Sequence, residues 1–161
     1  MRKLVVLLYF LSLNSLLFAD VSKEEFTIID RCDGKIFRVG NKLGHILEMY
    51  PNIAFRGEKK YSNITYREYQ GEGIVFSISA YTKSEMDANV LVIEILSNAY
   101  STRKGLVVGN NRNDVVSQYG EPNYIRKASY YYYNREDDLM MLEFSFDDRG
   151  LVNSIILATG T

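Results

Sequence analysis

The chain has few of the residues that carry chemistry. Its 161 residues include one cysteine, Cys32, one histidine, His45, and no tryptophan. A disulfide needs two cysteines, so an internal disulfide is excluded. A zinc site built from thiolates and imidazoles is excluded for the same reason. The sequence therefore predicts no metal site and no cofactor.

The same scarcity weighs against catalysis. A Cys-His nucleophile pair would have to use both Cys32 and His45, with Asp33 to orient the imidazole. His45 stands where the repeat of this chain has Asp114, which indicates an exposed or capping residue. The acidic runs 136–138 and 147–148 offer oxygen ligands for a hard cation, but Asp is ordinary in hairpin turns. We expect no catalytic residue and a protein that is not an enzyme.

An excess of basic residues is also absent. The chain has 19 Lys and Arg against 20 Asp and Glu, and loss of Arg2 and Lys3 with a cleaved leader leaves 17 against 20, a net charge of −3. A mildly acidic protein does not attract polyanions. We therefore expect no nucleic-acid partner. No stretch after residue 19 is long and apolar enough to cross a bilayer, so we also expect no stable membrane insertion after the leader is removed.

Long apolar runs are confined to the N-terminus. Residues 1–19 begin with Arg2 and Lys3, continue through apolar residues and end at the small Ala19, the layout of a bacterial signal peptide. An uncleaved membrane anchor is the alternative, since Leu17 is not the small residue preferred two positions before the cut. No cysteine follows at Asp20 to accept a lipid. We expect an exported protein, periplasmic or secreted, that begins near Asp20.

The most informative feature present is a duplication. Val39-Gly40-Asn41 leads into an apolar helical pattern and Pro51, and 69 residues later Val108-Gly109-Asn110 leads into a similar pattern and Pro122. In this alignment Ile46 corresponds to Val115 and Tyr50 to Tyr119. Self-similarity at a fixed offset indicates two copies of one small structural unit.

Each copy predicts a helix followed by strands. Leu43, Ile46, Leu47 and Tyr50 have the spacing of one helical face, and Pro51 ends that helix. In copy two Asn111 and Asp114 indicate a helix start, and Gly120 a stop. Strands are expected at Phe26–Ile29, Lys35–Val39, Ile64–Tyr69, Gly73–Ser79, Val90–Leu96, Gly105–Val108, Ser129–Tyr133, Leu139–Phe146 and Leu151–Leu157. The stretch 56–63 is polar and is not expected to form a strand.

These elements predict an α+β fold. The expected divisions are a signal peptide at 1–19, a first repeat with an N-terminal strand at 20–97, a connector at 98–103 and a second repeat at 104–161. The connector is too short for the copies to move independently. We therefore expect two tandem helix-plus-antiparallel-strand repeats that form one continuous sheet, with the helices packed on one face.

The combination of motifs resembles a known unit. The unit consists of a short strand, a glycine, a capped helix, the motif Tyr-Gly-x-Pro and a strand meander. Its residues in copy two are Gly109, Val115, Tyr119, Gly120, Pro122, Tyr132, Phe144, Gly150, Val152 and Ile155, and the weaker counterparts in copy one are Gly40, Ile46, Tyr50, Pro51 and Phe76. This resembles the unit of the SmpA/BamE outer-membrane assembly lipoproteins and of the beta-lactamase inhibitor protein, which has two units in tandem. The resemblance implies a sheet with one open face and a protein that binds other proteins. The lipidated cysteine of the SmpA/BamE lipoproteins is Asp20 here.

Tyrosines are the candidate binding residues. In a strand, Tyr130-Tyr131-Tyr132-Tyr133 must place two rings on each face, and Tyr66 and Tyr69 are candidates to extend the exposed stripe. Tyrosine combines a large rigid ring with a polar tip and is enriched in binding surfaces. The other interpretation is that these rings only stabilise the sheet as cross-strand pairs. We expect a non-catalytic protein-binding or cell-envelope assembly module, with a periplasmic small-ligand or cell-wall-binding protein as the alternative.

Overall fold

A computed structural model describes residues 21–61, 64–134 and 140–159 of the chain. The predicted signal peptide at 1–19 and the acidic run 136–138 lie outside the described residues. No helix in the described ranges is long and apolar enough to cross a membrane.

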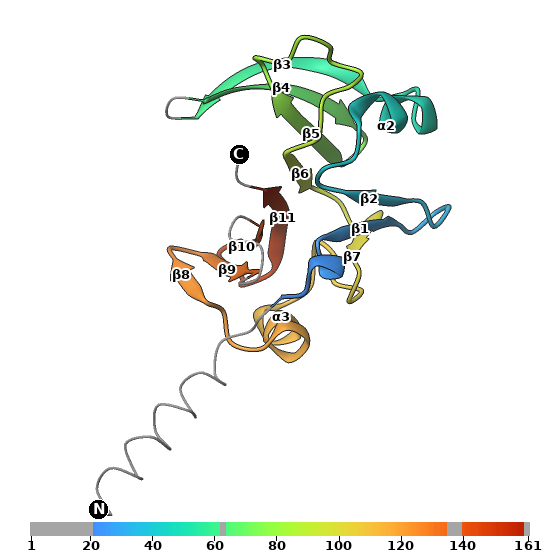
Figure 1. Cartoon of the computed structure of the whole chain (residues 1–161). Coiled ribbons are helices and arrows are strands. Elements are labelled where there is room, and N and C mark those ends of the chain that lie inside the picture. Colours follow the sequence, from blue (N-terminus) through green and yellow to red (C-terminus); the bar gives the residue numbers. More distant parts are fainter. Residues whose placement is uncertain (1–20, 62–63, 135–139, 160–161) are drawn as a thin grey trace, which may run out of the picture.

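The described chain forms two antiparallel sheets, two α-helices and a short 3-10 helix, η1 (Lys23–Glu25) (Figure 1). The large sheet has eight strands in the order β3 (Ala54–Tyr61), β4 (Ile64–Gly71), β5 (Ile74–Ser79), β6 (Val92–Ile95), β11 (Val152–Thr159), β10 (Met140–Phe146), β9 (Ser129–Tyr133) and β8 (Tyr124–Arg126). The small sheet has the order β2 (Ile36–Arg38), β1 (Thr27–Asp30) and β7 (Tyr100–Thr102). The helices are α2 (Leu43–Met49) and α3 (Arg112–Tyr119). The predicted α+β class is confirmed.

The strand order makes the duplication visible. Copy one forms the meander β3 to β6 and copy two forms β8 to β11, and the last strand of each meets the other at the centre of the sheet. In that central pairing Ile95 lies opposite Ile155 and Ile93 opposite Leu157. The predicted continuous sheet is therefore confirmed. From one edge to the other, the strands of copy one follow in ascending order and those of copy two in descending order. In the small sheet β1 pairs with β2 from the start of copy one on one side and with β7 on the other.

The two helices start in different ways. The Asn111 side chain accepts a hydrogen bond from the Asp114 backbone N–H at 3.1 Å, and Gly120, with φ of 77°, follows the end of α3. This agrees with the predicted cap and stop. Lys42 at the start of α2 makes no such side-chain cap. The backbone N–H groups of Leu43 and Gly44 instead donate to carbonyls of the β5–β6 connection, both at 2.9 Å, so tertiary contacts satisfy this helix end.

Three strand expectations are corrected. The polar stretch 56–63 was not expected to form a strand, yet residues 54–61 form β3, and β8 was not predicted. Both lie at the edges of the large sheet, where solvent-exposed strands lack a clear apolar alternation. The strand expected at Gly105–Val108 is wrong, because those residues are irregular and the buried Leu106 bonds to Thr102 in a local turn and not to a neighbouring strand. The strand of that region is β7, inside the predicted connector 98–103.

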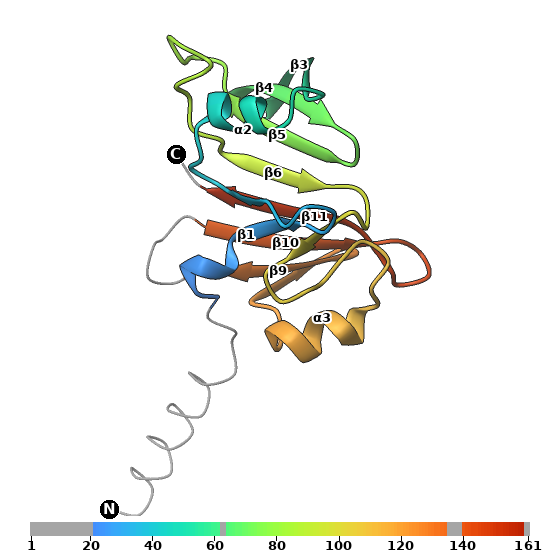
Figure 2. The same cartoon turned by 90° about the vertical axis from the view of Figure 1, so that its right-hand side faces the viewer.

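The core lies between the large sheet and a second layer made of both helices and the small sheet (Figure 2). Ile28 and Phe37 of the small sheet, Ile46 of α2 and Val115 of α3 are all fully buried. Large-sheet residues that face them include Phe76, Ile93, Leu142, Phe144, Ile155 and Leu157. Because this layer covers one face only, the other face of the large sheet stays open.

Candidate binding surface on the open face of the large sheet

Strand β9 divides its four tyrosines between the two faces, as alternation requires. Tyr132 is fully buried, and its hydroxyl donates to the Gly120 carbonyl at 3.0 Å. Tyr130 is half-buried on the same face, and its ring centroid lies 4.8 Å from that of Phe146. Tyr131 and Tyr133 therefore are the pair on the open face, and Tyr133 is 38 % exposed. Tyr130 and Tyr132 belong to the packed side.

The copy-one tyrosines do not form one stripe. Tyr66 and Tyr69 are three positions apart in β4 and so lie on opposite faces. Tyr69 is buried and its hydroxyl donates to the Glu85 carboxylate, and burial raises the pKa of Tyr69 to about 12. Tyr66 is half-buried on the open face. Of the six candidate tyrosines, only Tyr66, Tyr131 and Tyr133 remain on this face.

One aromatic residue of this face was not among the binding residues predicted from the sequence. Tyr124 of β8 lies opposite Tyr131, with 5.7 Å between ring centroids, and is 52 % exposed. Its strand was not predicted, so nothing in the sequence placed it beside Tyr131. The open-face tyrosines of copy two are therefore Tyr124, Tyr131 and Tyr133.

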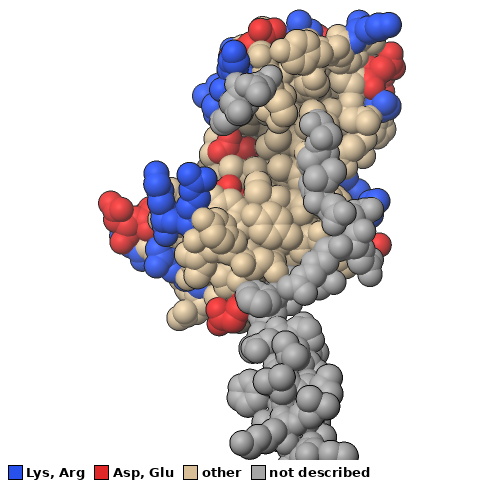
Figure 3. All heavy atoms as spheres, turned by 60° about the vertical axis from the view of Figure 1, so that its left-hand side comes forward, with Lys and Arg blue, Asp and Glu red and all other residues tan. Residues whose placement is uncertain are grey.

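A hollow of about 240 Å³ lies at the middle of the open face, across the strands where the two copies meet. Its apolar lining is Val92, Met141, Ile156 and Ala158, and its polar lining is Tyr66, Glu68, Ser77, Glu94 and Glu143. Figure 3 views the molecule from this side and shows a largely uncharged face with acidic side chains set into its middle and basic side chains around its margins. We call this feature the seam hollow.

The three glutamates of the seam hollow have different partners. Glu68 lies 3.7 Å from both the Arg56 Nη1 and the Lys59 Nζ. Glu143 accepts hydrogen bonds from the Tyr131 hydroxyl at 3.1 Å and the Ser145 hydroxyl at 3.0 Å.

Glu94 accepts a longer bond, 3.3 Å, from the Ser154 hydroxyl. In the described part of the chain, neither Glu94 nor Glu143 has an ion-pair partner. Burial raises the pKa of Tyr131, and the Glu143 carboxylate raises it further, so this hydroxyl stays protonated as a donor.

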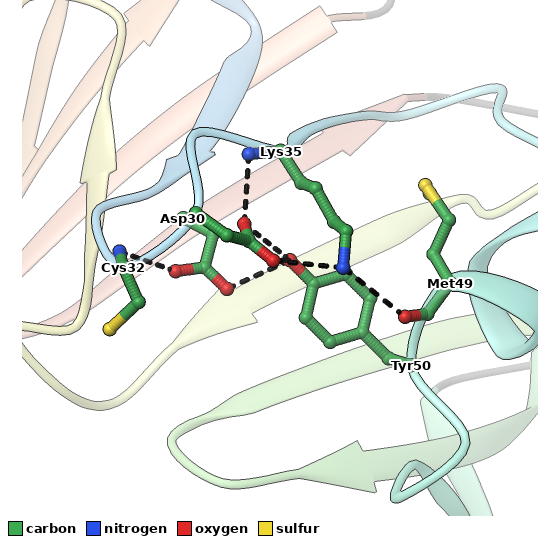
Figure 4. A network of polar contacts seen from close by, with 6 residues as sticks. Asp30, Cys32, Lys35, Met49 and Tyr50 are labelled. Carbon is green, nitrogen blue, oxygen red and sulfur yellow. Dashed lines mark hydrogen bonds and ion pairs between the residues drawn. The ribbon is translucent and has the colours of Figure 1, made fainter.

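A second polar cluster lies at the β1–β2 turn (Figure 4). The Tyr50 hydroxyl donates to Asp30 Oδ2 at 2.8 Å and lies 3.2 Å from Asp33 Oδ1. The Lys35 Nζ is 2.8 Å from the Asp33 carboxylate and 4.4 Å from the centre of the Tyr50 ring. Burial and both carboxylates raise the pKa of Tyr50, which keeps the phenol neutral. Each charge has an internal partner, so the cluster anchors the turn to the end of α2.

The residues considered for catalysis and metal binding do not come together. Cys32 is exposed in the β1–β2 turn and His45 is exposed on α2, and no hydrogen bond joins them in the described structure. Within residues 21–61, 64–134 and 140–159, no three His, Cys, Asp or Glu side chains are placed to hold a metal ion. Asp147 and Asp148 lie in the β10–β11 turn, where Asp147 binds the Arg149 guanidinium at 2.9 Å.

Comparisons with known proteins give no family. No family model matches the chain, and no curated protein sequence matches it. A solved structure of a DUF4309 family protein from Bacillus subtilis is similar over 74 % of this chain and 79 % of that one, with 14 % identity and a TM-score of 0.45. A cysteine-rich secretory protein from Staphylococcus aureus is similar over 75 % of this chain but 44 % of its own length, with 12 % identity and a TM-score of 0.41. The similarity to the SmpA/BamE unit remains one of short motifs.

Proposed function

We propose that this protein is an exported, non-catalytic protein-binding module of the cell envelope and that the open face of its large sheet is the binding surface. The observation that carries the proposal is the one-sided packing of that sheet. Helices and the small sheet cover one face, while the other presents tyrosines beside the seam hollow, which has a mixed apolar and acidic lining. An uncovered sheet face of this composition is typical of a surface that meets another macromolecule.

The aromatic residues support this use of the face. Tyr124 and Tyr133 are well exposed, and Tyr131 is held between Tyr124 and the Glu143 carboxylate. Tyrosine loses little conformational entropy on binding because it has only two side-chain torsions, so a prearranged group of rings is suited to an interface. The same rings also stabilise cross-strand pairing, which accounts for their position but not for their exposure.

The shape of the seam hollow favours a protein partner over a small ligand. Its volume of about 240 Å³ opens to solvent across the face. Small-molecule sites usually enclose roughly 300–1,000 Å³ and bury most of the ligand. Export is supported by the basic and apolar pattern of residues 1–19.

Capture from a native envelope fraction tests the function. The mature chain, residues 20–161, serves as bait beside a variant with Tyr131→Ala and Tyr133→Ala. A matched control is Ile36→Ala, since Ile36 is 48 % exposed but lies in the small sheet on the opposite side. We expect the control to retain the captured protein and the double variant to lose it, while both stay folded with melting temperatures within about 10 °C of the wild type.

Equal capture by all three baits would show that the open face is not the binding surface. N-terminal sequencing of the native protein tests export separately. Material that begins near Asp20 supports it, and full-length protein in the cytoplasmic fraction contradicts it.

A further inference from the structure

Two carboxylates face each other across the seam between the copies. Glu94 of β6 lies opposite Ile156 of β11, and Ile156 lies opposite Glu143 of β10. The three residues thus form one row across adjacent strands on the open face. Neighbouring strands are about 4.8 Å apart, so the backbones of Glu94 and Glu143 are separated by roughly 10 Å with an apolar side chain between them. This spacing leaves room for one cationic group above Ile156.

The charges of this pair are not balanced within the described chain. Glu94 receives one hydroxyl hydrogen bond and Glu143 receives two, and neither meets a Lys or Arg side chain. Glu68, in the same hollow, does meet two, Arg56 and Lys59. Partial burial of a carboxylate without a cation is unfavourable because water is removed and neutral hydroxyl donors replace only part of the charge stabilisation that water gave. A cation from outside the chain would supply that stabilisation.

A serine hydroxyl in the same hollow offers a further polar contact. Ser77 lines the seam hollow and is only 6 % exposed. Its hydroxyl has one donor and two acceptor positions and makes no hydrogen bond to another described residue. The fully enclosed, unpaired side-chain atom of the described chain is the Tyr119 hydroxyl, so the Ser77 hydroxyl is accessible from the hollow. This hydroxyl can therefore donate to, or accept from, a group that enters the hollow.

We propose that the seam hollow binds a protein segment that inserts one Lys or Arg side chain between Glu94 and Glu143, with apolar residues on either side of it. The proposal rests on the proposed function, since it names the chemistry of the partner at the same face. The aliphatic stem of the inserted side chain packs on Ile156 and Met141, which are apolar. Its charged end meets the two carboxylates, and the flanking apolar residues reach Val92 and the tyrosines.

Short synthetic peptides test the chemistry directly. They share one apolar sequence and differ only in the central residue, which is Arg, Lys, Gln or Glu, and each is titrated against residues 20–161 in a calorimeter. We expect the Arg and Lys peptides to bind about 30-fold or more tightly than the Gln peptide, because a partly buried charge pair depends strongly on both members. Equal binding by all four peptides, or binding by none, overturns the proposal.

Isosteric variants tie the effect to the two carboxylates. Glu94→Gln with Glu143→Gln is expected to remove the preference for a central Arg or Lys, while the exposed Glu48→Gln on α2 is the matched control. Melting temperature checks folding of both. Argininamide is a further probe, and binding as tight as that of the Arg peptide would overturn a protein segment as the occupant.

The capture experiment separates this inference from the function on which it rests. If Glu94→Gln with Glu143→Gln keeps the captured protein while Tyr131→Ala with Tyr133→Ala loses it, the open face is the interface but the cationic insertion is wrong. If none of these variants loses the protein, the proposed function fails as well.

Discussion

The two copies share one local arrangement of a lysine over a tyrosine ring, but they differ in the hydrogen bonding of the tyrosine hydroxyl. Lys35 Nζ lies 4.4 Å from the centre of the Tyr50 ring, and Lys104 Nζ lies 4.5 Å from that of Tyr119. Both lysines also donate to the carbonyl of the residue before the tyrosine, at 3.4 Å to Met49 and 3.0 Å to Gln118. All three correspondences have the offset of 69 found in the sequence, so the duplication extends to side-chain contacts.

The tyrosine hydroxyls show where the copies have diverged. The Tyr50 hydroxyl donates to the buried Asp30 carboxylate. The Tyr119 hydroxyl is buried with no hydrogen-bond partner in the described chain. Burial raises the pKa of Tyr119, and the nearby Thr102 side chain lowers it by a smaller amount. Both copies therefore keep a lysine over a tyrosine ring. In copy one the contact lies at an exposed turn, and in copy two the ring belongs to the core.

The largest expected effect concerns the independence of the copies. Residues 98–161 expressed alone should not fold, because β11 loses β6 and β7 loses β1, which exposes strand edges and an uncovered apolar face. Circular dichroism and size exclusion check this against residues 20–161. A cooperative thermal transition from a monomeric fragment would show that copy two is an autonomous domain.

Within copy two, neighbouring tyrosines should differ strongly. Tyr132→Ala removes a fully buried ring and should lower the free energy of unfolding by about 3–5 kcal/mol. Tyr131→Ala, on the open face, should lower it by less than about 1 kcal/mol. Urea unfolding measures both. Equal losses would mean that the open face also contributes to the core.

Removing the two corresponding hydroxyls should give different results. Tyr50→Phe removes the donor to Oδ2 of the buried Asp30 carboxylate, whose Oδ1 keeps the Cys32 backbone N–H, and should cost about 1.5–3 kcal/mol of stability, as expected for a bond to a charged group. Tyr119→Phe removes an unpaired buried hydroxyl and should be neutral or stabilising by about 1 kcal/mol. Chemical denaturation of the two variants measures these changes in the free energy of unfolding. A comparable loss in Tyr119→Phe would reveal a hydrogen bond at that hydroxyl.

The smallest expected effect is that of the shared lysine. Lys35→Met and Lys104→Met each remove a cation over a tyrosine ring, a contact that contributes about 0.5–1 kcal/mol at exposed sites. Each lysine also has a carboxylate partner, Asp33 or Glu25. Similar losses in thermal unfolding would indicate that the two contacts still act alike, whereas a loss in one copy alone would extend the divergence from the hydroxyls to the lysines.

Local patterns in the sequence were sufficient for the inner part of the fold. The sequence predicted, to within a residue or two, the helix at Leu43 to Tyr50, the Asn111 cap and the central strands. It could do so because burial imposes a clear periodicity on the chain. The duplication predicted one continuous sheet. Edge strands β3 and β8 were missed because an exposed edge imposes no apolar pattern, and Tyr124 was missed with β8.

The sequence by itself determined that the β9 tyrosines divide two and two, since alternation is a local property of any strand. Only the tertiary structure decided that Tyr131 and Tyr133 are on the open face, because the covered face is set by where the helices and the small sheet pack. The seam hollow also depends on tertiary structure alone. Glu94 and Glu143 are far apart in the chain and meet across Ile156 only because β6, β11 and β10 are neighbours in the sheet.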